Sequence, residues 1–378
     1  MVYPSAKQSK IYPPLKEARK SLRINFYRSP IAKEEFRILL QLSDIRAWLQ
    51  TLAVVGYLLV TGGLTYYFFF HQMWVLFALA LFAYGTYASF LGSGCHEFTH
   101  GRVFKTKWLN KFFLYLFGLI NMFNHEEYLL SHTYHHRYTL HPEGDREVLL
   151  PVSPVIRPLY ILQMFTINLF GGPGSDGIFQ KIRNTFRTAF IKLPEAASSK
   201  KHDTLVEPID DTLQEWLSAL YKAHPNERIK AVRWARLILL FHALVIAVSV
   251  VFQLWLLPVL ITLSRSLANW LKNPAVFLQH AGLRTNVADF RKSTRTIKLD
   301  PVTSLMYWYM NWHVEHHMYP GVPCYNLRRL NRVIKSDLPK PKGLLSAYLE
   351  VQETWNRQQF EPEYQFDMPL PEVDVATR

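Results

Sequence analysis

The sequence predicts an all-α integral membrane protein with four transmembrane helices, arranged as two hairpins, and a helical cap on one side of the membrane. Three observations lead to this prediction. Apolar residues make up 49% of the chain and are concentrated in a few long runs without charge. Basic residues crowd the segments beside these runs. Histidines gather in tight clusters near the ends of the runs, where a cap would carry them.

The first two apolar runs predict one helical hairpin. They extend over about residues 48–70 and 73–95, and each is long enough to cross a hydrocarbon layer of about 30 Å. The connection at His71 and Gln72 carries no Lys or Arg, whereas the flanks of the pair are strongly basic. By the positive-inside rule, both ends of this hairpin are cytoplasmic.

A further apolar run, residues 237–264, contains 28 residues without Asp, Glu, Lys or Arg. This length exceeds one crossing and falls short of two ideal ones. Extended at both ends, the run predicts two more transmembrane helices at about 231–250 and 252–270, with a turn near Val250 to Gln253. Basic residues at both ends favour such a second hairpin over one tilted helix.

Two shorter apolar stretches, Leu109 to Phe123 and Pro158 to Phe170, are too brief for crossings and are expected to lie along the membrane interface. The predicted organisation therefore has three parts. Residues 1–47 form a cytoplasmic N-terminal segment, residues 48–335 a membrane domain, and residues 336–378 a cytoplasmic C-terminal tail.

The charge and the cysteine content narrow the partners and the chemistry. The formal net charge of +14 fits anionic lipid better than nucleic acid, because the basic residues flank the apolar runs and no nucleic-acid-binding module is recognisable. No nucleic-acid partner is expected. The two cysteines, Cys95 and Cys324, are far apart in sequence and indicate neither a disulfide framework nor a thiolate metal site.

Histidine clusters carry the strongest functional signal in the sequence. Residues three and four apart share a helix face, so one cluster can aim its imidazoles at one point. Imidazole binds iron, copper, nickel and zinc, and one ion takes three or four protein ligands. Eight clustered imidazoles are too many for one ion and suit two, provided that the second hairpin returns the last cluster to the side of the others. The clusters are His96 and His100; His132, His135 and His136; and His313, His316 and His317.

A competing interpretation comes from the first cluster. The segment His96-Glu97-Phe98-Thr99-His100 is also a literal His-Glu-x-x-His motif, in which two histidines bind zinc and the glutamate serves as general base. An intramembrane zinc metalloprotease is therefore the alternative from another class of function. It leaves six clustered histidines without a role.

The segments HEFTH, HTYHH and HVEHH, in this order and around two hydrophobic hairpins, resemble the three histidine boxes of the membrane fatty acid desaturase superfamily. The resemblance extends over roughly residues 48–335, and the segment NWHVEHHMYPGVPCYNLRRLN is also similar to the family's third box and the Tyr-Pro and Leu-rich helix start downstream of that box. It implies a four-crossing fold whose cytoplasmic cap holds a non-haem di-iron site. With O2 as co-substrate and two electrons, such a site removes hydrogen from an unactivated carbon chain.

On this resemblance the eight clustered histidines are the expected catalytic iron ligands. His280 is the expected ninth metal ligand, because its placement after the last crossing is similar to that of an extra histidine in some family members. Acyl-coenzyme A desaturases carry an asparagine four residues earlier, where this chain has Val276, so the coenzyme A form of the substrate stays open. The carboxylates expected to orient the imidazoles are Glu97, Asp145, Glu147, Asp289 and Glu315.

The expected function is thus oxygen-dependent desaturation of a lipid or fatty acyl chain by a multi-pass membrane protein whose active site lies on the cytoplasmic side. A hydroxylase or ketolase with the same two irons is the alternative among enzymes, and a non-catalytic membrane scaffold is the alternative outside them. The sequence after the second cluster leaves no room for a fused cytochrome domain. The electrons are therefore expected from a separate protein of the ferredoxin or cytochrome b5 type.

Overall fold

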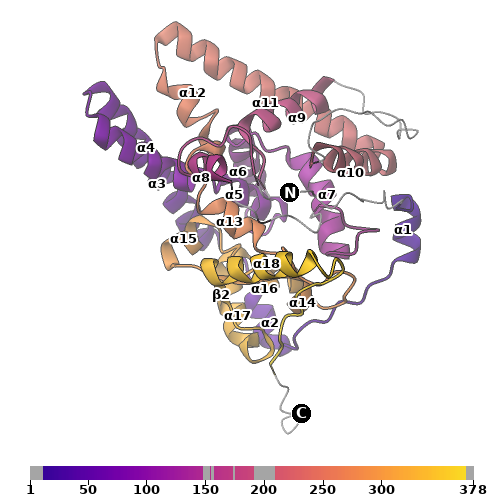
Figure 1. The fold of residues 1–378 in the computed structure, drawn as a ribbon. Helices are drawn as coiled ribbons and strands as arrows, with labels where there is room; N and C mark the ends of the chain where they lie inside the picture. Colours follow the sequence, from indigo (N-terminus) through magenta and orange to yellow (C-terminus); the bar gives the residue numbers. More distant parts are fainter. Residues whose placement is uncertain (1–11, 148–153, 155–156, 173–174, 191–208, 372–378) are drawn as a thin grey trace.

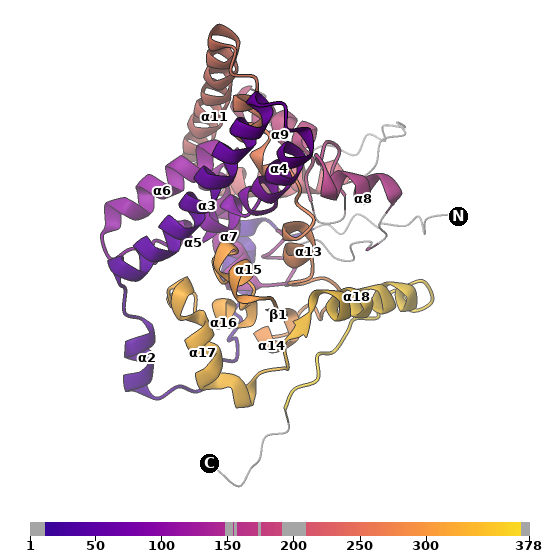
Figure 2. The same ribbon diagram turned by 90° about the vertical axis from the view of Figure 1, so that its left-hand side faces the viewer.

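The structure is a computed structural model, and it describes residues 12–147, 154, 157–172, 175–190 and 209–371, with residues 209–214 described for the backbone only. In these residues the regular structure is almost entirely helical, and two short strands, β1 (Ile297–Lys298) and β2 (Lys342–Gly343), pair in parallel. Long apolar helices project from one end of the molecule. The short helices of the C-terminal part gather at the other end (Figure 1, Figure 2).

Helix α3 (Asp44–Phe70) is the first of the long apolar helices. It begins at Ser43, whose hydroxyl accepts a hydrogen bond from the Arg46 amide at 3.4 Å. It ends before Gln72, where the backbone turns through the left-handed region. The helix is long and apolar enough to cross a membrane and covers the predicted crossing at 48–70.

Helix α4 (Trp74–Ala88) returns alongside α3, and helix α5 (Leu91–Thr99) extends it with only a slight interruption. Together they form a second apolar stretch, Trp74–Thr99, which is also long enough to cross a membrane and covers the predicted crossing at 73–95. Because α5 continues the crossing, the HEFTH segment lies at the end of this apolar stretch.

Helix α11 (Pro225–Phe252) is the third helix of membrane-crossing length in the described part of the chain. Pro225 occupies its first turn, where the missing amide proton of proline leaves no bond unmade. The helix ends at Gln253, which adopts the left-handed conformation. The predicted turn near Val250 to Gln253 therefore lies at the place where the chain reverses.

The prediction of a continuous helix at 252–270 is wrong. The returning chain forms a five-residue helix α12 (Leu256–Leu260) that packs back against α11, followed by a single 3-10 turn, η1 (Ser264–Ser266). The physical reason is that backbone groups of this stretch form hydrogen bonds with another loop instead of within a helix. The Ser266 carbonyl accepts a hydrogen bond from the Asn168 amide at 2.7 Å, and the Ala268 amide donates to the Thr166 carbonyl at 2.8 Å, so this stretch pairs with another loop.

Three amphipathic helices lie beside the long ones: α6 (Lys107–Ile120), α8 (Pro158–Phe165) and α9 (Ile178–Phe190). Helix α6 buries Phe113 and Phe117 and exposes large apolar side chains, including Trp108 and Phe112, on another side. Helices α6 and α8 coincide with the two stretches that were too short for crossings. A one-sided apolar surface of this kind is typical of helices at a membrane interface.

The remaining helices are shorter than the three of membrane-crossing length. They are α1 (Leu15–Ser21), α2 (Lys33–Leu39), α7 (His125–Tyr138), α10 (Ile209–Ala223), α13 (Lys272–Phe277), α14 (Phe290–Ser293), α15 (Pro301–Met306), α16 (His313–Met318), η2 (Cys324–Asn326), α17 (Leu327–Ile334), η3 (Lys335–Asp337) and α18 (Leu344–Gln358). Helix α18 lies within the predicted tail, so that segment is in large part structured. Residues 1–11 and 372–378 of the predicted terminal segments lie outside the described residues.

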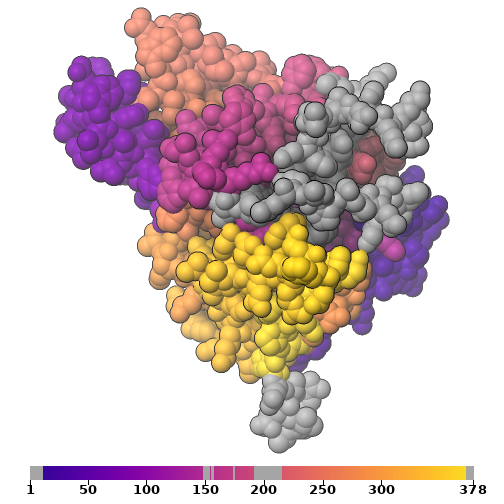
Figure 3. Space-filling model, viewed as in Figure 1, coloured from indigo at the N-terminus to yellow at the C-terminus, as the bar shows by residue number. Residues whose placement is uncertain are grey.

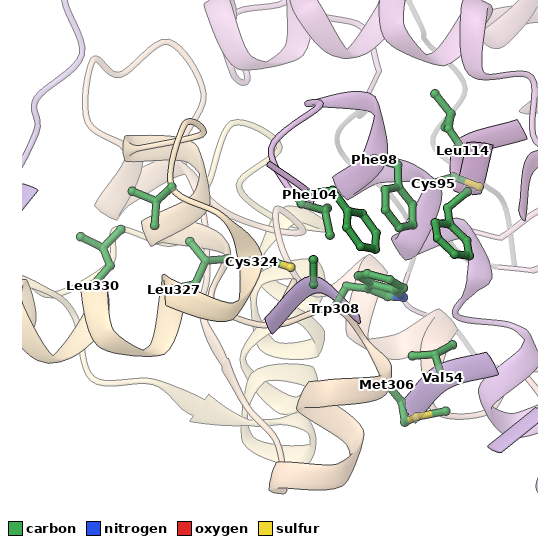
Figure 4. Packing of buried hydrophobic residues seen from close by; sticks show 14 of the residues in the cluster. Val54, Cys95, Phe98, Phe104, Leu114, Met306, Trp308, Cys324, Leu327 and Leu330 are labelled. Atoms are coloured by element: carbon green, nitrogen blue, oxygen red, sulfur yellow. The ribbon is translucent and has the colours of Figure 1, made fainter. Parts of the chain in front are cut away.

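The main hydrophobic core fixes α5 against the chain that leads into α16 (Figure 4). Phe98 of α5 packs edge-on against the fully buried Trp308, with ring centroids 5.0 Å apart. Gly94, one turn earlier on α5, allows this approach, because a Cβ at that position would lie 2.9 Å from the Trp308 ring. The core therefore holds the first and last histidine clusters in a defined relation to each other.

Candidate metal centre

Three helices and one turn supply the imidazoles of the candidate site. His96 lies on α5 and His100 directly follows it. The second cluster lies on α7 and the third on α16. His280 lies three residues beyond the end of α13. The structure thus brings together nine histidines that are as far apart as residues 96 and 317 in the sequence.

The nine imidazoles form two groups, in each of which one nitrogen per ring lies within 4.8 Å of the others, and His132 and His135, one from each group, also lie within that distance of each other and of Glu147. The first group consists of His96, His100, His132, His136 and His316. The second group consists of His135, His280, His313 and His317. Every histidine that the sequence analysis singled out as a metal ligand belongs to one of these groups.

Helix periodicity explains how the clusters divide between the groups. Side chains four residues apart share a helix face. Each such pair, His96 with His100, His132 with His136, and His313 with His317, stays in one group. The remaining histidine of α7, His135, and that of α16, His316, each join the opposite group. Helices α7 and α16 therefore lie between the two groups and contribute to both.

In the first group the Nε2 atoms approach one another closely. The Nε2 of His96 lies 2.9 Å from that of His316 and 3.2 Å from that of His100. The Nε2 of His136 lies 3.2 Å from that of His316. The Nε2 of His132 is buried and has no hydrogen-bond partner.

The second group repeats this arrangement. The Nε2 of His313 lies 3.1 Å from that of His280 and 3.2 Å from that of His317. All four residues of the group, including His135, are buried.

The other ring nitrogens determine what the converging Nε2 atoms can do. Carbonyl and carboxylate oxygens only accept hydrogen bonds, so an Nδ1 that faces one carries the proton. The Nδ1 of His280 donates to the Ser293 carbonyl at 2.9 Å, that of His132 to Glu147 at 3.0 Å, and that of His135 to Asp145 at 2.9 Å. In the neutral ring the Nε2 of each then presents a lone pair to the centre of its group.

Two further Nδ1 atoms face hydroxyl groups. The Nδ1 of His96 lies 2.8 Å from the Tyr128 hydroxyl, and that of His317 lies 3.1 Å from the Thr139 hydroxyl. Converging lone pairs repel one another unless a cation lies between them. The donor set and its orientation therefore fit one metal ion in each group.

Burial keeps most of these imidazoles neutral, which is the form that binds metal. Burial lowers the pKa of His100 to about 4 and that of His280 to about 3. In a larger set of histidines the pKa also lies well below its usual value, first because of burial and next because of the charge that neighbouring imidazoles would carry. This set is His132, His136, His313, His316 and His317.

His135 is the exception among these residues. Burial opposes its protonation, but the adjacent Asp145 and then Glu147 outweigh burial and raise the pKa of His135 to about 8. Burial in turn raises the pKa of Glu147 to about 7. The Asp145 carboxylate is held in place by the Leu140 amide at 2.9 Å as well as by His135.

Four of the five expected orienting carboxylates divide into two sets. Asp145 and Glu147 contact imidazole Nδ1 atoms as expected. Glu315 instead accepts hydrogen bonds from Thr296 at 2.7 Å and Asn331 at 2.5 Å. Asp289 caps α14 and pairs with Arg291. Those two carboxylates thus bind groups other than the imidazoles.

Glu97 does not have the environment that a metalloprotease requires. It is 3% exposed, and its Oε1 has no hydrogen-bond partner and lies 3.7 Å from the Nδ1 of His316. His96 and His100 share their group with three further imidazoles, which leaves little room for the water position of a catalytic zinc site. The arrangement does not favour the protease interpretation.

Sequence reasoning missed Tyr128, Thr139 and the Ser293 carbonyl as partners of the imidazoles. Tyr128 could have been found, because it lies one turn before His132 on α7, and its ring stacks on that imidazole with centroids 4.6 Å apart. The other two partners are visible only in three dimensions.

Comparison with known families agrees with the arrangement of the site. The sequence model of the fatty acid desaturase family matches residues 72–348. This range is most of the chain and contains all nine histidines of the two groups. No curated protein sequence gives a significant match. The family consists of membrane-associated oxidoreductases that act on lipid or fatty acyl chains, and the three long apolar helices agree with a membrane protein. The two histidine groups, the apolar helices that carry them and the extent of this match together show that the chain belongs to the fatty acid desaturase family.

Proposed function

We propose that this protein is an oxygen-dependent di-iron desaturase that introduces a double bond into a lipid or fatty acyl chain. One observation carries the proposal: two groups of imidazoles, one of five and one of four, converge so that one nitrogen of each ring lies within 4.8 Å of the others in its group. Neutral nitrogen donors do not cancel the charge of a bound metal ion. When bound, two irons would supply the activation of O2 that hydrogen removal from an unactivated carbon requires.

The roles that we propose for the residues follow from their contacts. The five imidazoles of the first group hold one iron, and the four of the second group, which include His280, hold the other. Asp145 and Glu147 orient His135 and His132 and keep the proton on Nδ1. Seven of the nine histidines are buried, which limits the access of water and protects a strong oxidant from side reactions.

We also propose a topology of four crossings with the histidine groups on the cytoplasmic side. Helices α3, α4 with α5, and α11 account for three crossings. The fourth consists of the irregular return through α12 and η1, which packs against α11 and α4. Irregular backbone is tolerated at membrane depth where protein surrounds it. The proposed parts of the chain are the N-terminal segment 1–47, the membrane domain 48–335 and the C-terminal segment 336–378.

The proposed reaction consumes two electrons, which a separate donor of the ferredoxin or cytochrome b5 type supplies. The substrate reaches the site from the membrane, because the histidine groups lie at the ends of apolar helices. This arrangement suits an acyl chain that remains largely in the hydrocarbon layer.

Mass spectrometry of lipids from cells with and without the protein tests the proposal. A lipid that is lighter by two daltons in cells with the protein is the expected result. A product heavier by sixteen daltons indicates hydroxylation by the same site instead, and an unchanged lipid profile in cells that contain iron-loaded protein contradicts both. Metal analysis of the purified protein is expected to give about two irons per chain, in keeping with the ligand number.

A further inference from the structure

His280 differs from the other eight imidazoles in how the chain carries it. The others lie on α5, α7 and α16 or directly follow α5, so helix geometry fixes their positions. His280 lies in a turn after α13, in the sequence Leu278-Gln279-His280-Ala281-Gly282. Its position must therefore be fixed by contacts with other parts of the chain.

Arg295 makes the contacts that hold this turn. Its side chain is 2% exposed, and its guanidinium group donates hydrogen bonds to the carbonyls of Leu278 and Ala281, the latter at 3.2 Å. Its backbone amide donates to the Gln279 carbonyl at 2.7 Å. One buried cation thus binds the carbonyls on both sides of His280.

Glu350 of α18 is the carboxylate that balances this buried cation. The Oε1 of Glu350 accepts hydrogen bonds from the Nε of Arg295 at 3.1 Å and from its Nη2 at 2.5 Å. Glu350 is 7% exposed, and its other oxygen accepts a hydrogen bond from Lys342. An unpaired guanidinium at this depth would be strongly unfavourable, so the Arg295 contacts depend on α18.

The chain after Glu350 adds further contacts to the same turn. Gly282 has a positive φ of 73°, and a Cβ there would lie 3.3 Å from Thr354 of α18. The Phe366 amide donates to the Gly282 carbonyl at 2.8 Å. This C-terminal part of the chain covers one face of the cap in Figure 3. The family match ends at residue 348, before all of these C-terminal contacts.

We propose that Glu350 is a positioning residue that acts through Arg295 to hold His280 in the second histidine group. The C-terminal segment of this chain thereby determines the occupancy of one of the two metal positions. This inference rests on the proposed function, because it assumes that both groups bind metal.

The substitution Glu350→Gln removes the charge that balances Arg295 with almost no change in shape. We expect the second group to lose on the order of tenfold in metal affinity, as second-shell changes commonly do, while the first group retains its metal. After dialysis against a chelator, the iron content is expected to fall from about two to about one per chain. The Mössbauer spectrum of the iron-loaded protein is expected to lose one of its two components. Glu353→Gln, an exposed change on the same helix, is the matched control.

A double-mutant cycle separates this role from a general effect on stability. If Glu350 acts through His280, the variant that combines His280→Ala with Glu350→Gln binds metal no more weakly than His280→Ala alone. Additive losses, or equal losses from both groups in Glu350→Gln, overturn the proposal. Should Glu350→Gln fail to fold, Glu350→Asp, which keeps the charge at a shorter reach, is expected to show the same selective loss to a smaller degree.

The outcomes also distinguish this inference from the proposed function. A wild-type protein that binds no metal contradicts the proposed function itself. A wild-type protein with about two irons and a well-folded Glu350→Gln variant with the same content and spectrum contradicts only the role of Glu350.

Discussion

The placement of single imidazole nitrogens carries the functional argument at the scale of residues. In a neutral imidazole whose Nδ1 donates to a carboxylate or carbonyl, Nε2 carries no proton and presents a lone pair. The carboxylates therefore do more than neutralise charge, because they select the tautomer that can bind metal. Asp145 and Glu147, which follow the second cluster by only a few residues, perform this role for His135 and His132.

The substitution His316→Ala is expected to abolish stable iron binding and turnover. His316 belongs to the first group, and its Nε2 lies within 3.2 Å of those of His96 and His136. Removing it takes away one ligand and leaves a buried cavity beside the others. Metal analysis and a lipid assay check this expectation. The variant His71→Ala, at the exposed turn between α3 and α4, is the control, and retained turnover in His316→Ala contradicts the ligand assignment.

The substitution Asp145→Asn tests the selection of the tautomer. The amide keeps the size of the carboxylate but loses the charge that holds the Nδ1 proton of His135. We expect metal affinity to fall by about 10–100-fold, with the second group affected first. Chelator competition measures this change. Glu143→Gln, an exposed change two residues away, serves as the control. Equal metal affinities in the two variants would contradict a role of Asp145 in the site.

At the scale of elements, the orientation of α5 and α16 decides whether the first and third clusters can meet. The approach of Gly94 to Trp308 sets this orientation, together with the left-handed backbone at Trp308 and Tyr309. Two consecutive residues other than glycine in that conformation are costly, so the surrounding core must hold them. The element that carries the third cluster is thus positioned by packing against the element that carries the first.

The substitution Gly94→Ala is expected to destabilise the protein by about 1–3 kcal/mol, because the new methyl group would lie 2.9 Å from the Trp308 ring. Gly56→Ala on α3 is the matched control, since a Cβ there meets no atom within 4 Å. At that open helical position alanine is expected to be neutral or to stabilise by about 0.5–1 kcal/mol. Thermal melting in detergent measures both variants. An unchanged melting temperature for Gly94→Ala would contradict the tight packing of Gly94 against Trp308.

At the scale of the whole molecule, many buried neutral imidazoles tie the stability of the metal-free protein to pH. The pKa of His100 is about 4 and that of His280 about 3, below the usual value near 6.5. The unfolded chain therefore binds more protons than the folded chain once the pH falls below about 6.5, and stability is lost as the pH falls toward 4. His135 acts in the opposite direction between about pH 6.5 and 8, and Glu147, whose pKa burial raises to about 7, does so between about pH 4.5 and 7. The imidazoles with a lowered pKa outnumber these two groups.

We therefore expect the melting temperature of the metal-free protein to decrease steadily as the pH falls from about 6.5 to 4.5. Each such histidine lowers the free energy of unfolding by up to about 1.4 kcal/mol per pH unit. Differential scanning fluorimetry over this range measures the change. Bound metal should reduce the slope, because it competes with the protons. A metal-free protein that becomes more stable on acidification would contradict the burial of these rings.

The membrane arrangement makes a second prediction at this scale. With one cysteine at His71, in the turn between α3 and α4, and another at the exposed Glu353 in α18, an impermeant maleimide should reach the two from opposite sides of the membrane. The native Cys95 and Cys324 are buried and should not react. Labelling of both new cysteines from the same side contradicts the proposed topology.

Much of the fold and site can be predicted from sequence where local patterns act alone. Uncharged runs predicted the long helices α3, α4 with α5, and α11, because length and apolar composition suffice for that inference. The histidine spacing correctly predicted that rings four residues apart share a group, but rings three residues apart fall in opposite groups. The predicted helix at 252–270 failed because the backbone near Ser266 bonds to a distant loop, which no local pattern reveals.

The sequence by itself determined the apolar helices, the family and the eight clustered histidines, because hydrophobicity, residue identity and helical periodicity are properties of short segments. His280 was expected only from the resemblance to the family. Only the tertiary structure decided that His135 and His316 each leave the cluster of their neighbours and join the opposite group. It also decided that His280 depends on Arg295 and on α18. These relations join residues far apart in the chain, and they arise from the packing of helices against one another, which the order of residues does not display.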